Sequence, residues 1–283
     1  MNKIFIKGLS KLKLLNKVNT FSSATINGHS FKIPIIRGNG VQNLQGSEKW
    51  MDEVLKRVIS LKAGSFLDVG VNVGQSLLKI KSLNKDVNYY GFEPNPTCIL
   101  YLNELIKKNK IEKASIFPVG ISDKTEIREL NFYYDSDTDS AASIIENFRP
   151  WQKVLKKEYI PCYTINDFRD IIKFSSISVI KIDVEGAEME VLGGLVPSIK
   201  ESRPIIIMEI LPVYKKENND RLQRQLTIEN ILKENTYCIL RIMKKEDDQF
   251  SHFETLSEIG IHSNMQWCDY VFCPGEIVSN LIN

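Results

Sequence analysis

The chain has 283 residues, of which 43% are hydrophobic, and its formal net charge is +2. This is the composition of an ordinary globular protein that can bury one large core, or one core with a small appendage. No apolar run approaches the ~20 residues that span a bilayer, and lysines stand where a secretory signal would need its apolar segment. We therefore expect a cytoplasmic protein. The five cysteines form no C-x-x-C pair, so the sequence supports neither a zinc knuckle nor a disulfide framework.

The positive charge is concentrated near the N-terminus, because residues 1–50 hold eight Lys or Arg and only one acidic residue. Apolar residues recur there at spacings of three and four, with lysines largely between them, which predicts a basic amphipathic helix within residues 1–18. Such a helix can contact an anionic membrane surface through residues 1–20, although docking on the protein's own body is the commoner fate. No basic and aromatic clusters interleave along the rest of the chain, so we expect no nucleic-acid partner.

Two further elements precede the main domain. Residues 25–36 predict a hairpin that turns at Asn27-Gly28. Ser47 is then expected to cap a helix whose apolar side carries Trp50, Met51, Val54, Leu55 and Val58. Basic helix, hairpin and leading helix together form an expected N-terminal extension over residues 1–63.

From residue 64 to residue 283 strands and helices alternate. Strands are predicted within 65–69, 87–92, 114–119, 126–134, 177–182, 204–208, 237–243 and 267–273. Helices are predicted from Gln75, from Asn95-Pro96, from the capping box at residues 164–167 and over about 222–235, whereas residues 135–161 look polar and irregular. This alternation predicts an α/β doubly wound sheet, whose ligands lie at the carboxyl ends of the strands.

The most informative stretch is Asp68-Val-Gly-Val-Asn-Val-Gly74, between a buried strand and a helix. A strand that breaks into a glycine loop and a helix turns backbone N–H groups toward a nucleotide-like ligand. A dinucleotide fingerprint needs a middle glycine where this chain has Asn72, and Asp68 would repel a pyrophosphate. The same acid suits the ammonium and sulfonium groups of S-adenosylmethionine. An ordinary strand-to-helix turn is the alternative.

Glu93 ends the next predicted strand, nineteen residues after Gly74. A carboxylate at that place can accept hydrogen bonds from both ribose hydroxyls of either cofactor class. The loop, and not Glu93, therefore distinguishes the two cofactors.

A second acidic cluster lies where the strand predicted within 177–182 ends, in the sequence KIDVEGAE over residues 181–188. Methyl transfer to a hydroxyl requires removal of a proton, and a nearby carboxylate can act as the base. Asp183 is the first catalytic candidate, with Glu185 or Glu188 behind it, although one of these acids could cap the helix. Glu209, at the end of the strand predicted within 204–208, could hold substrate or share a divalent metal with Asp183. We predict no metal, and keep His262 as a second candidate base.

Six segments in this order resemble the FkbM-type family of S-adenosylmethionine-dependent methyltransferases: FLDVGVNVGQ (66–75), GFEPNP (91–96), FPVGISD (117–123), YTINDF (163–168), IKIDVEGAE (180–188) and RPIIIMEI (203–210). The resemblance covers roughly residues 26–215. It implies a class I methyltransferase fold, with a mostly parallel sheet and one antiparallel strand. It also implies that Asp68, Gly70, Asn72 and Gly74 hold the methionine moiety, that Glu93 holds the ribose, and that Ser122 and Asp123 lie beside the adenine. Gln75, Pro94, Asn95 and Asp183 complete the expected cofactor site.

The resemblance implies O-methylation of a hydroxyl, as in sugars of surface glycans or related metabolites. Residues 135–160 and the hairpin are expected to form the acceptor wall, with contacts from residues 140–145 and Tyr133. Two other functions stay open at this point. One is an NAD-dependent oxidoreductase on the same fold, and the other is a catalytically silent domain that binds the cofactor or a glycan. The sequence does not predict the oligomeric state.

Overall fold

The computed structural model describes residues 14–282 of the chain. Most of the predicted basic helix lies outside these residues. Within them, a short 3-10 helix, η1 (Leu15–Lys17), leads directly into an extended strand that starts at Asn19, so no α-helix continues to residue 18. Among residues 14–282, no helix combines the length and the apolar character that crossing a bilayer requires.

The predicted doubly wound sheet is confirmed. Eight strands form one sheet in the order β12-β11-β13-β10-β9-β3-β4-β5. Five neighbouring strands run parallel, namely β5 (Ala114–Phe117), β4 (Tyr89–Phe92), β3 (Ser65–Val69), β9 (Ile177–Ile182) and β10 (Ile205–Glu209). The chain moves outward from β3 to β5 and then returns to the other side of β3 with β9. The switch point of the topology therefore lies between β3 and β9, where such sheets bind ligands.

The prediction of one antiparallel strand is incomplete. β13 (Asp269–Pro274) runs antiparallel between β10 and β11 (Tyr237–Lys244), and β12 (Phe250–Leu256) adds a second antiparallel strand at the edge. β12 escaped prediction because none of its residues is fully buried, so it carries no continuous apolar run.

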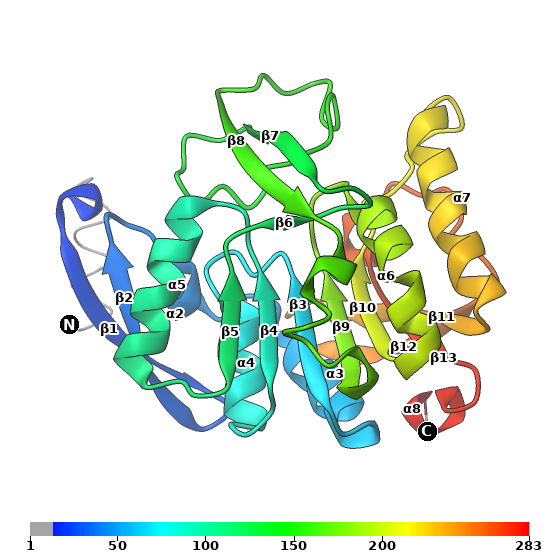
Figure 1. Ribbon diagram of the computed structural model, residues 1–283, viewed down its shortest axis with the longest axis horizontal. Coiled ribbons are helices and arrows are strands. Elements are labelled where there is room, and N and C mark those ends of the chain that lie inside the picture. Colours follow the sequence, from blue (N-terminus) through cyan, green and yellow to red (C-terminus); the bar gives the residue numbers. More distant parts are fainter. Residues whose placement is uncertain (1–13, 283) are drawn as a thin grey trace.

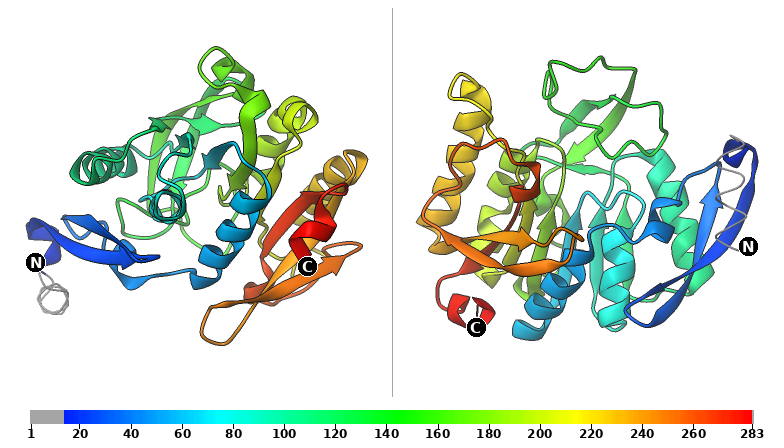
Figure 2. Two further views of the ribbon diagram at one scale, coloured as in Figure 1. Left: turned by 90° about the horizontal axis from the view of Figure 1, so that it is seen from below. Right: turned by 180° about the vertical axis from the view of Figure 1, so that it is seen from behind.

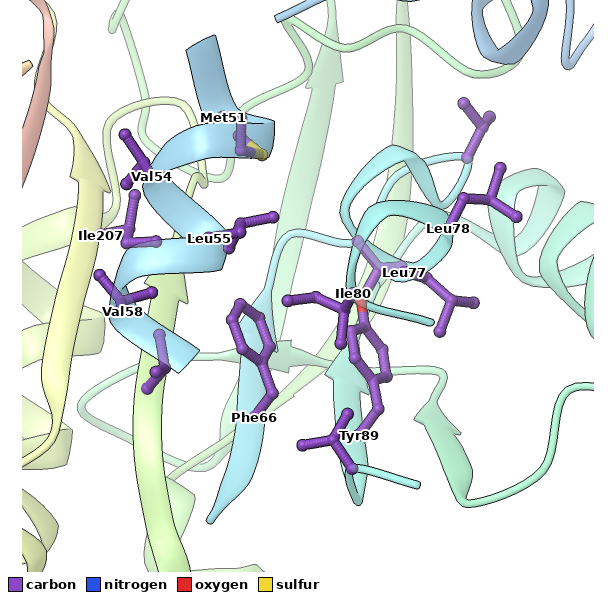
Figure 3. Packing of buried hydrophobic residues seen from close by; sticks show 14 of the residues in the cluster. Met51, Val54, Leu55, Val58, Phe66, Leu77, Leu78, Ile80, Tyr89 and Ile207 are labelled. Atoms are coloured by element: carbon purple, nitrogen blue, oxygen red, sulfur yellow. The ribbon is translucent and has the colours of Figure 1, made fainter. Parts of the chain in front are cut away.

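Helices cover both faces of the sheet, so successive residues of one strand enter different cores. On one face α3 (Lys49–Leu61) and α4 (Gln75–Leu83) pack over a cluster that includes Phe66 and Ile207. On the other, α6 (Glu188–Ser202) and α7 (Asn219–Glu234) pack over a cluster that includes Leu67 and Met208. Figure 1 brings α6 and α7 to the front, and the rear view of Figure 2 brings α3 and α4 forward. Figure 3 shows the side chains of α3 over Phe66.

The leading helix is confirmed, but its cap is not. The five predicted apolar residues of α3 are all buried. Its N-cap is Glu48 rather than Ser47, in a left-handed conformation with φ of 53° and without a side-chain cap. This conformation matters below, because Glu48 lines the cavity at the sheet edge.

The hairpin is also confirmed, and it is longer than predicted. β1 (Asn19–Ile26) and β2 (His29–Ile36) turn at Asn27 and Gly28, whose φ values of 48° and 79° fit a type I′ turn. β2 packs against α5 (Pro96–Asn109), and Ile33 and Ile35 belong to the same core as α3. Figure 1 shows the hairpin at the opposite end of the molecule from β11–β13. The hairpin is thus tied to the main domain by a common core.

A second small sheet lies over the carboxyl ends of the central strands, as Figure 1 shows. It has the order β6-β8-β7, from β6 (Gly120–Ile121), β7 (Glu126–Phe132) and β8 (Lys156–Tyr163). The strand predicted within 126–134 is confirmed, but the prediction of irregular chain up to residue 161 is wrong for β8. The first residues of β8 are charged and exposed, so the sequence shows no apolar pattern from which the strand could be predicted. The capping box of Thr164 and Asp167 is present, although it opens a 3-10 helix, η2 (Ile165–Phe168), and not an α-helix.

Candidate active site

A cavity of about 340 Å³ lies at the carboxyl ends of β3, β4, β9 and β10, beneath the small sheet. Ligand pockets typically start at about 300 Å³. Of the predicted site residues, the structure brings together around it Gly70, Asn72, Gln75, Glu93, Pro94, Asn95, Asp183, Glu185 and Glu209. This is the switch point of the sheet, where an α/β fold places its ligand.

The loop after β3 is shaped by three left-handed residues, Gly70, Asn72 and Gly74, with φ values of 92°, 49° and 83°. A side chain on Gly70 would force the neighbouring loop to move, because a Cβ atom there would lie 1.8 Å from the carbonyl oxygen of Asp183. The side chain of Asn72 accepts a hydrogen bond from the N–H of Val73 at 2.8 Å, which supports its unusual backbone conformation. Gly74 lies away from the cavity and packs against Leu102 and Leu105 of α5.

Glu93 joins the loops that follow β3 and β4. One carboxylate oxygen accepts from the N–H of Asn72 at 2.7 Å, and the other accepts from the N–H of Asn95 at 2.8 Å. Burial raises the pKa of Glu93 to about 7, while these two N–H groups oppose the shift. Each carboxylate oxygen has a second acceptor position, so Glu93 can still accept from two ribose hydroxyls. The residues present therefore fit an adenosyl cofactor.

Asp68 does not line the cavity, which corrects the expectation that it faces the methionine moiety. It is fully buried in β3, where the hydroxyl of Tyr89 donates a hydrogen bond to it and Lys181 Nζ lies 3.4 Å away. Lys181 also pairs with Asp183 at 3.1 Å. Asp183 and Asp68 raise the pKa of Lys181 against the effect of burial. Asp68 thus holds the ammonium group that pairs with Asp183, so its influence on the cavity is indirect.

Three carboxylates converge at the floor of the cavity. One oxygen from each of Asp183, Glu185 and Glu209 lies within 4.8 Å of the others. Burial, and then the charge of Asp183, raises the pKa of Glu209 well above its ordinary value and that of Glu185 to about 8. Arg149 donates to Glu185 at 2.6 Å. Such a group can share protons, accept from a hydroxyl or hold a hard divalent cation.

Glu188 has a different position from the other predicted acids. Its carboxylate accepts from the N–H of Gly186 at 2.8 Å at the start of α6, and it lines a neighbouring cavity. Burial raises its pKa to about 7. Glu188 therefore stabilises the turn before α6 without capping the helix, whose N-cap is Ala187, and it does not line the first cavity with the other predicted acids.

Glu48 is a site residue that the sequence analysis missed. It is partly buried, lines the cavity, and has a pKa that burial and then Asp183 raise to about 7. Its position depends on the left-handed conformation of Glu48 before α3, which cannot be predicted from the residue pattern.

Three other predicted contacts lie outside the cavity. Ser122 is fully buried and donates to Asp123, which is exposed on the surface, and Val119, Gly120 and Ile121 take their place in the lining. The loop therefore reaches the cavity slightly earlier in the chain than predicted. His262 packs against Trp267, has its ring 3.3 Å from the hydroxyl of Tyr270, and does not line the cavity.

The upper wall of the cavity comes from the loop between β7 and β8. Asp139, Ser140, Ala142 and Ile144 line it. Asp139 accepts from three backbone N–H groups, those of Tyr133, Tyr134 and Ala141. Ser143 Oγ donates to the carbonyl of Glu185 at 2.6 Å, which ties the loop to the acidic cluster. Neither Tyr133 nor the hairpin strands line this cavity.

The doubly wound sheet and the acid-lined cavity at its switch point agree with the fold and site that the sequence predicts for a methyltransferase of class I. The chain belongs to the FkbM methyltransferase family, since the profile of the methyltransferase FkbM domain matches residues 68–249. The match starts later than the predicted resemblance and continues beyond residue 215, through β11. Membership of this family argues against the oxidoreductase alternative.

Individual relatives are distant. Methyltransferase 1 of Beauveria bassiana (strain ARSEF 2860) is 22% identical over 142 residues, which are 46% of this chain and 57% of that protein. The chain thus spans little more than half the length of this curated relative. The crystal structure of methyltransferase FkbM from Methylobacillus flagellatus KT is similar over 74% of this chain and 43% of that one, with 18% identity and a TM-score of 0.45. The structure of M. jannaschii TYW2 in complex with AdoMet covers 91% of this chain and 88% of its own, with 14% identity and a TM-score of 0.40.

Proposed function

We propose that the protein transfers a methyl group from S-adenosylmethionine to a hydroxyl of a sugar in a glycan or of a related metabolite. The observation that carries this proposal is the position of Asp183 on the cavity, where it pairs with Lys181 and where only β3 separates its strand from that of Glu93. S-adenosylmethionine, when bound, supplies the electrophilic methyl group. The chain supplies a place for the cofactor beside Glu93 and a base for the acceptor.

Asp183 is the base that the geometry favours. The attacking hydroxyl must lose its proton as its oxygen bonds to the methyl carbon, and a carboxylate within hydrogen-bond reach can take that proton. The side chain of Asp183 is 33% exposed, compared with 16% for Glu185. Glu185 is engaged by Arg149, and burial, followed by the charge of Asp183, raises the pKa of Glu209. Whenever it carries a proton, Glu209 can donate a hydrogen bond to the acceptor or to Asp183.

A hydroxyl acceptor suits the remaining lining. Ser140, Asp139 and Glu48 offer polar groups, and Ala142, Ile144 and Leu130 offer an apolar surface. A pocket with a few polar groups set in an apolar wall orients a ligand through its hydroxyls. Loop 138–145, which is anchored to the carbonyl of Glu185 through Ser143, forms the acceptor side of the proposed site.

The first test is a calorimetric titration with S-adenosylmethionine, S-adenosylhomocysteine and NAD in parallel, in which we expect micromolar binding of the first two only. The second is transfer of a labelled methyl group to a panel of sugars, oligosaccharides and polyketide alcohols. Methyl ethers resist alkaline hydrolysis and methyl esters do not, so alkali-stable label on a saccharide supports the proposal. Alkali-labile label would assign a carboxylate acceptor instead. Cofactor binding without transfer to any acceptor would favour the catalytically silent domain.

A further inference from the structure

A second cavity, of about 400 Å³, lies beside the first. It is bounded by residues 145–151 of the β7–β8 loop, by the turn before α6 and by the first turns of α7. Figure 1 shows α7 beside α6, on the side of the sheet that leads toward β13 and β11. None of the predicted cofactor residues lines this second cavity.

The two cavities share a wall that is one residue thick at three places. Glu185 and Ala187 line the first cavity, whereas Gly186 and Glu188 line the second. In the same way, Ile144 and Glu209 line the first cavity, and the residues that follow them, Ile145 and Ile210, line the second. The two cavities therefore lie side by side, and an acceptor that occupies both has to pass around the residues that separate them.

An aromatic platform forms one side of the second cavity. Trp151 is 59% exposed, and Phe148 packs over Gly186, where an added Cβ would lie 2.5 Å from its ring. The guanidinium carbon of Arg221 lies 4.7 Å from the centre of the Phe148 ring and 5.8 Å from that of Trp151. An exposed indole beside a stacked guanidinium offers a flat apolar face bordered by hydrogen-bond donors.

Arg221 has free capacity for a ligand. It donates to the carbonyl oxygens of Pro212 and Phe148, and no carboxylate within residues 14–282 lies at ion-pair distance from it. The neighbouring Arg224, by contrast, is held by Glu190. A guanidinium carries five N–H donors, so Arg221 retains donors beyond its two carbonyl contacts.

Gln225 supplies an acceptor in the same cavity. It is 2% exposed, and its Nε2 donates to Glu229 at 3.2 Å and to the carbonyl of Gly260 at 3.0 Å. Because both partners are acceptors, they fix which end of the amide is the nitrogen. Its Oε1 is buried and accepts no hydrogen bond from residues 14–282. A buried carbonyl oxygen without a partner destabilises the protein, and a ligand hydroxyl that reaches Oε1 would remove that cost.

We propose that this second cavity binds a further sugar unit of the acceptor, so that the acceptor is a neutral oligosaccharide or glycoside and not a free monosaccharide. A sugar ring has an apolar C–H face that packs on an indole, and hydroxyls at its edges that pair with Arg221 and Gln225. Exposed acids on the rim, Glu146, Glu217 and Asp220, favour hydroxyl donors over an anionic group. This inference rests on the proposed function, and it extends that function by specifying the size and the charge of the acceptor.

The test is an array of defined neutral mono-, di- and trisaccharides, probed with purified protein saturated with S-adenosylhomocysteine. We expect binding of particular oligosaccharides at least ~10-fold tighter than of their constituent monosaccharides, which corresponds to about 1.4 kcal/mol. Trp151→Ala and Arg221→Gln should each lose ~10-fold in affinity, as central aromatic and Arg contacts do. Tyr159→Ala is the matched control, because Tyr159 is also exposed, at 74%, but does not line the cavity. Trp151→Phe tests the platform with little change of shape.

Equal binding of monosaccharides and oligosaccharides would overturn the inference, as would absence of binding to the array or oligosaccharide binding that Trp151→Ala leaves unchanged. Labelled methyl transfer on the same array separates the two proposals. Transfer to saccharides with a KM that is indifferent to Trp151 would remove the second cavity from acceptor binding and leave the proposed function. Oligosaccharide binding that depends on Trp151, but without transfer, would keep the binding site and remove the proposed function.

Discussion

The carbonyl oxygen of Asp183 lies 1.8 Å from the place where a Cβ atom on Gly70 would stand. The two loops that follow β3 and β9 are therefore packed backbone against backbone at the switch point, and Gly70 also has a φ of 92°. We expect Gly70→Ala to push Asp183 away from the cavity and to lower the free energy of unfolding by about 1–3 kcal/mol, the usual cost of overpacking. Urea denaturation and calorimetric titration with S-adenosylmethionine measure the two effects.

Gly193→Ala is the matched control for this substitution. Gly193 lies inside α6, and nothing lies within 4 Å of the position that its Cβ would take. Replacing a helical glycine by alanine gains about 0.5–1 kcal/mol. If Gly70→Ala unfolds at the same urea concentration as the wild type and binds the cofactor equally well, the contact with Asp183 does not shape the site.

Glu93 tests the ribose assignment. Glu93→Ala removes a carboxylate that accepts from the N–H groups of Asn72 and Asn95 and is free to accept from a ribose. Hydrogen bonds to charged groups are worth about 1.5–3 kcal/mol, so we expect cofactor affinity to fall by ~10- to 100-fold in a calorimetric titration. Circular dichroism should show the fold retained, and an unchanged dissociation constant would remove Glu93 from the cofactor site.

The site could be predicted from sequence wherever a residue follows a strand directly. Glu93, Asp183 and Glu209 each stand at or just after the end of a buried parallel strand, and the topology brings these ends to one edge of the sheet. Glu48 could not be found in this way, because it reaches the cavity from a left-handed turn before a helix. Asp68 shows a different limit. Its place on β3 could be predicted from the sequence, but its pairing with Lys181 on the neighbouring strand could not.

The fold was predictable where strands are buried on both faces. β3, β9 and β10 carry continuous apolar runs, and their positions agree with prediction. β8 begins with charged residues, and β12 lies at the edge of the main sheet. Packing against neighbouring strands, and not an apolar sequence pattern, therefore decides their conformation.

Asp183 is expected to affect turnover more than binding. Asp183→Asn keeps the size of the side chain but cannot accept a proton, so methyl transfer should slow by ~10²- to 10⁴-fold if it is the general base. Cofactor affinity should be nearly kept, which separates a catalytic role from a binding role. Single-turnover transfer from labelled S-adenosylmethionine gives the rate, and a rate within a few-fold of the wild type would exclude Asp183 as the base.

Lys181 is expected to affect stability. It lies between Asp68 and Asp183, and both it and Asp68 are buried. Removing one partner of a buried ion pair costs about 3–5 kcal/mol, because it leaves a charge without compensation. We expect Lys181→Met to lose stability of this size in urea denaturation. The double variant Asp68→Asn, Lys181→Met should recover part of the loss, and purely additive effects of the two substitutions would contradict the pairing.

Chelation tests the expectation of metal independence. The oxygens of Asp183, Glu185 and Glu209 are close enough to bind a divalent cation together, but Lys181 and Arg149 already pair with two of these acids. We therefore expect dialysis against EDTA to leave methyl transfer unchanged. Loss of transfer with EDTA and its recovery with Mg²⁺ would show that the three carboxylates hold a metal ion.

The raised pKa values of Glu185 and Glu93 predict how the free energy of unfolding depends on pH. Burial raises the pKa of Glu185 to about 8 and that of Glu93 to about 7, whereas an unfolded chain returns both to about 4.5. When the folded pKa is the higher one, the stabilising contribution is complete below the unfolded pKa and is lost as the pH rises through the folded pKa. The free energy of unfolding without ligand should therefore fall between about pH 4.5 and pH 8. Urea denaturation across this range measures the slope, and Glu185→Gln should make it shallower. A rise of stability over the same interval would mean that these carboxylates are ionised in the folded protein and are stabilised by Arg149 and Lys181.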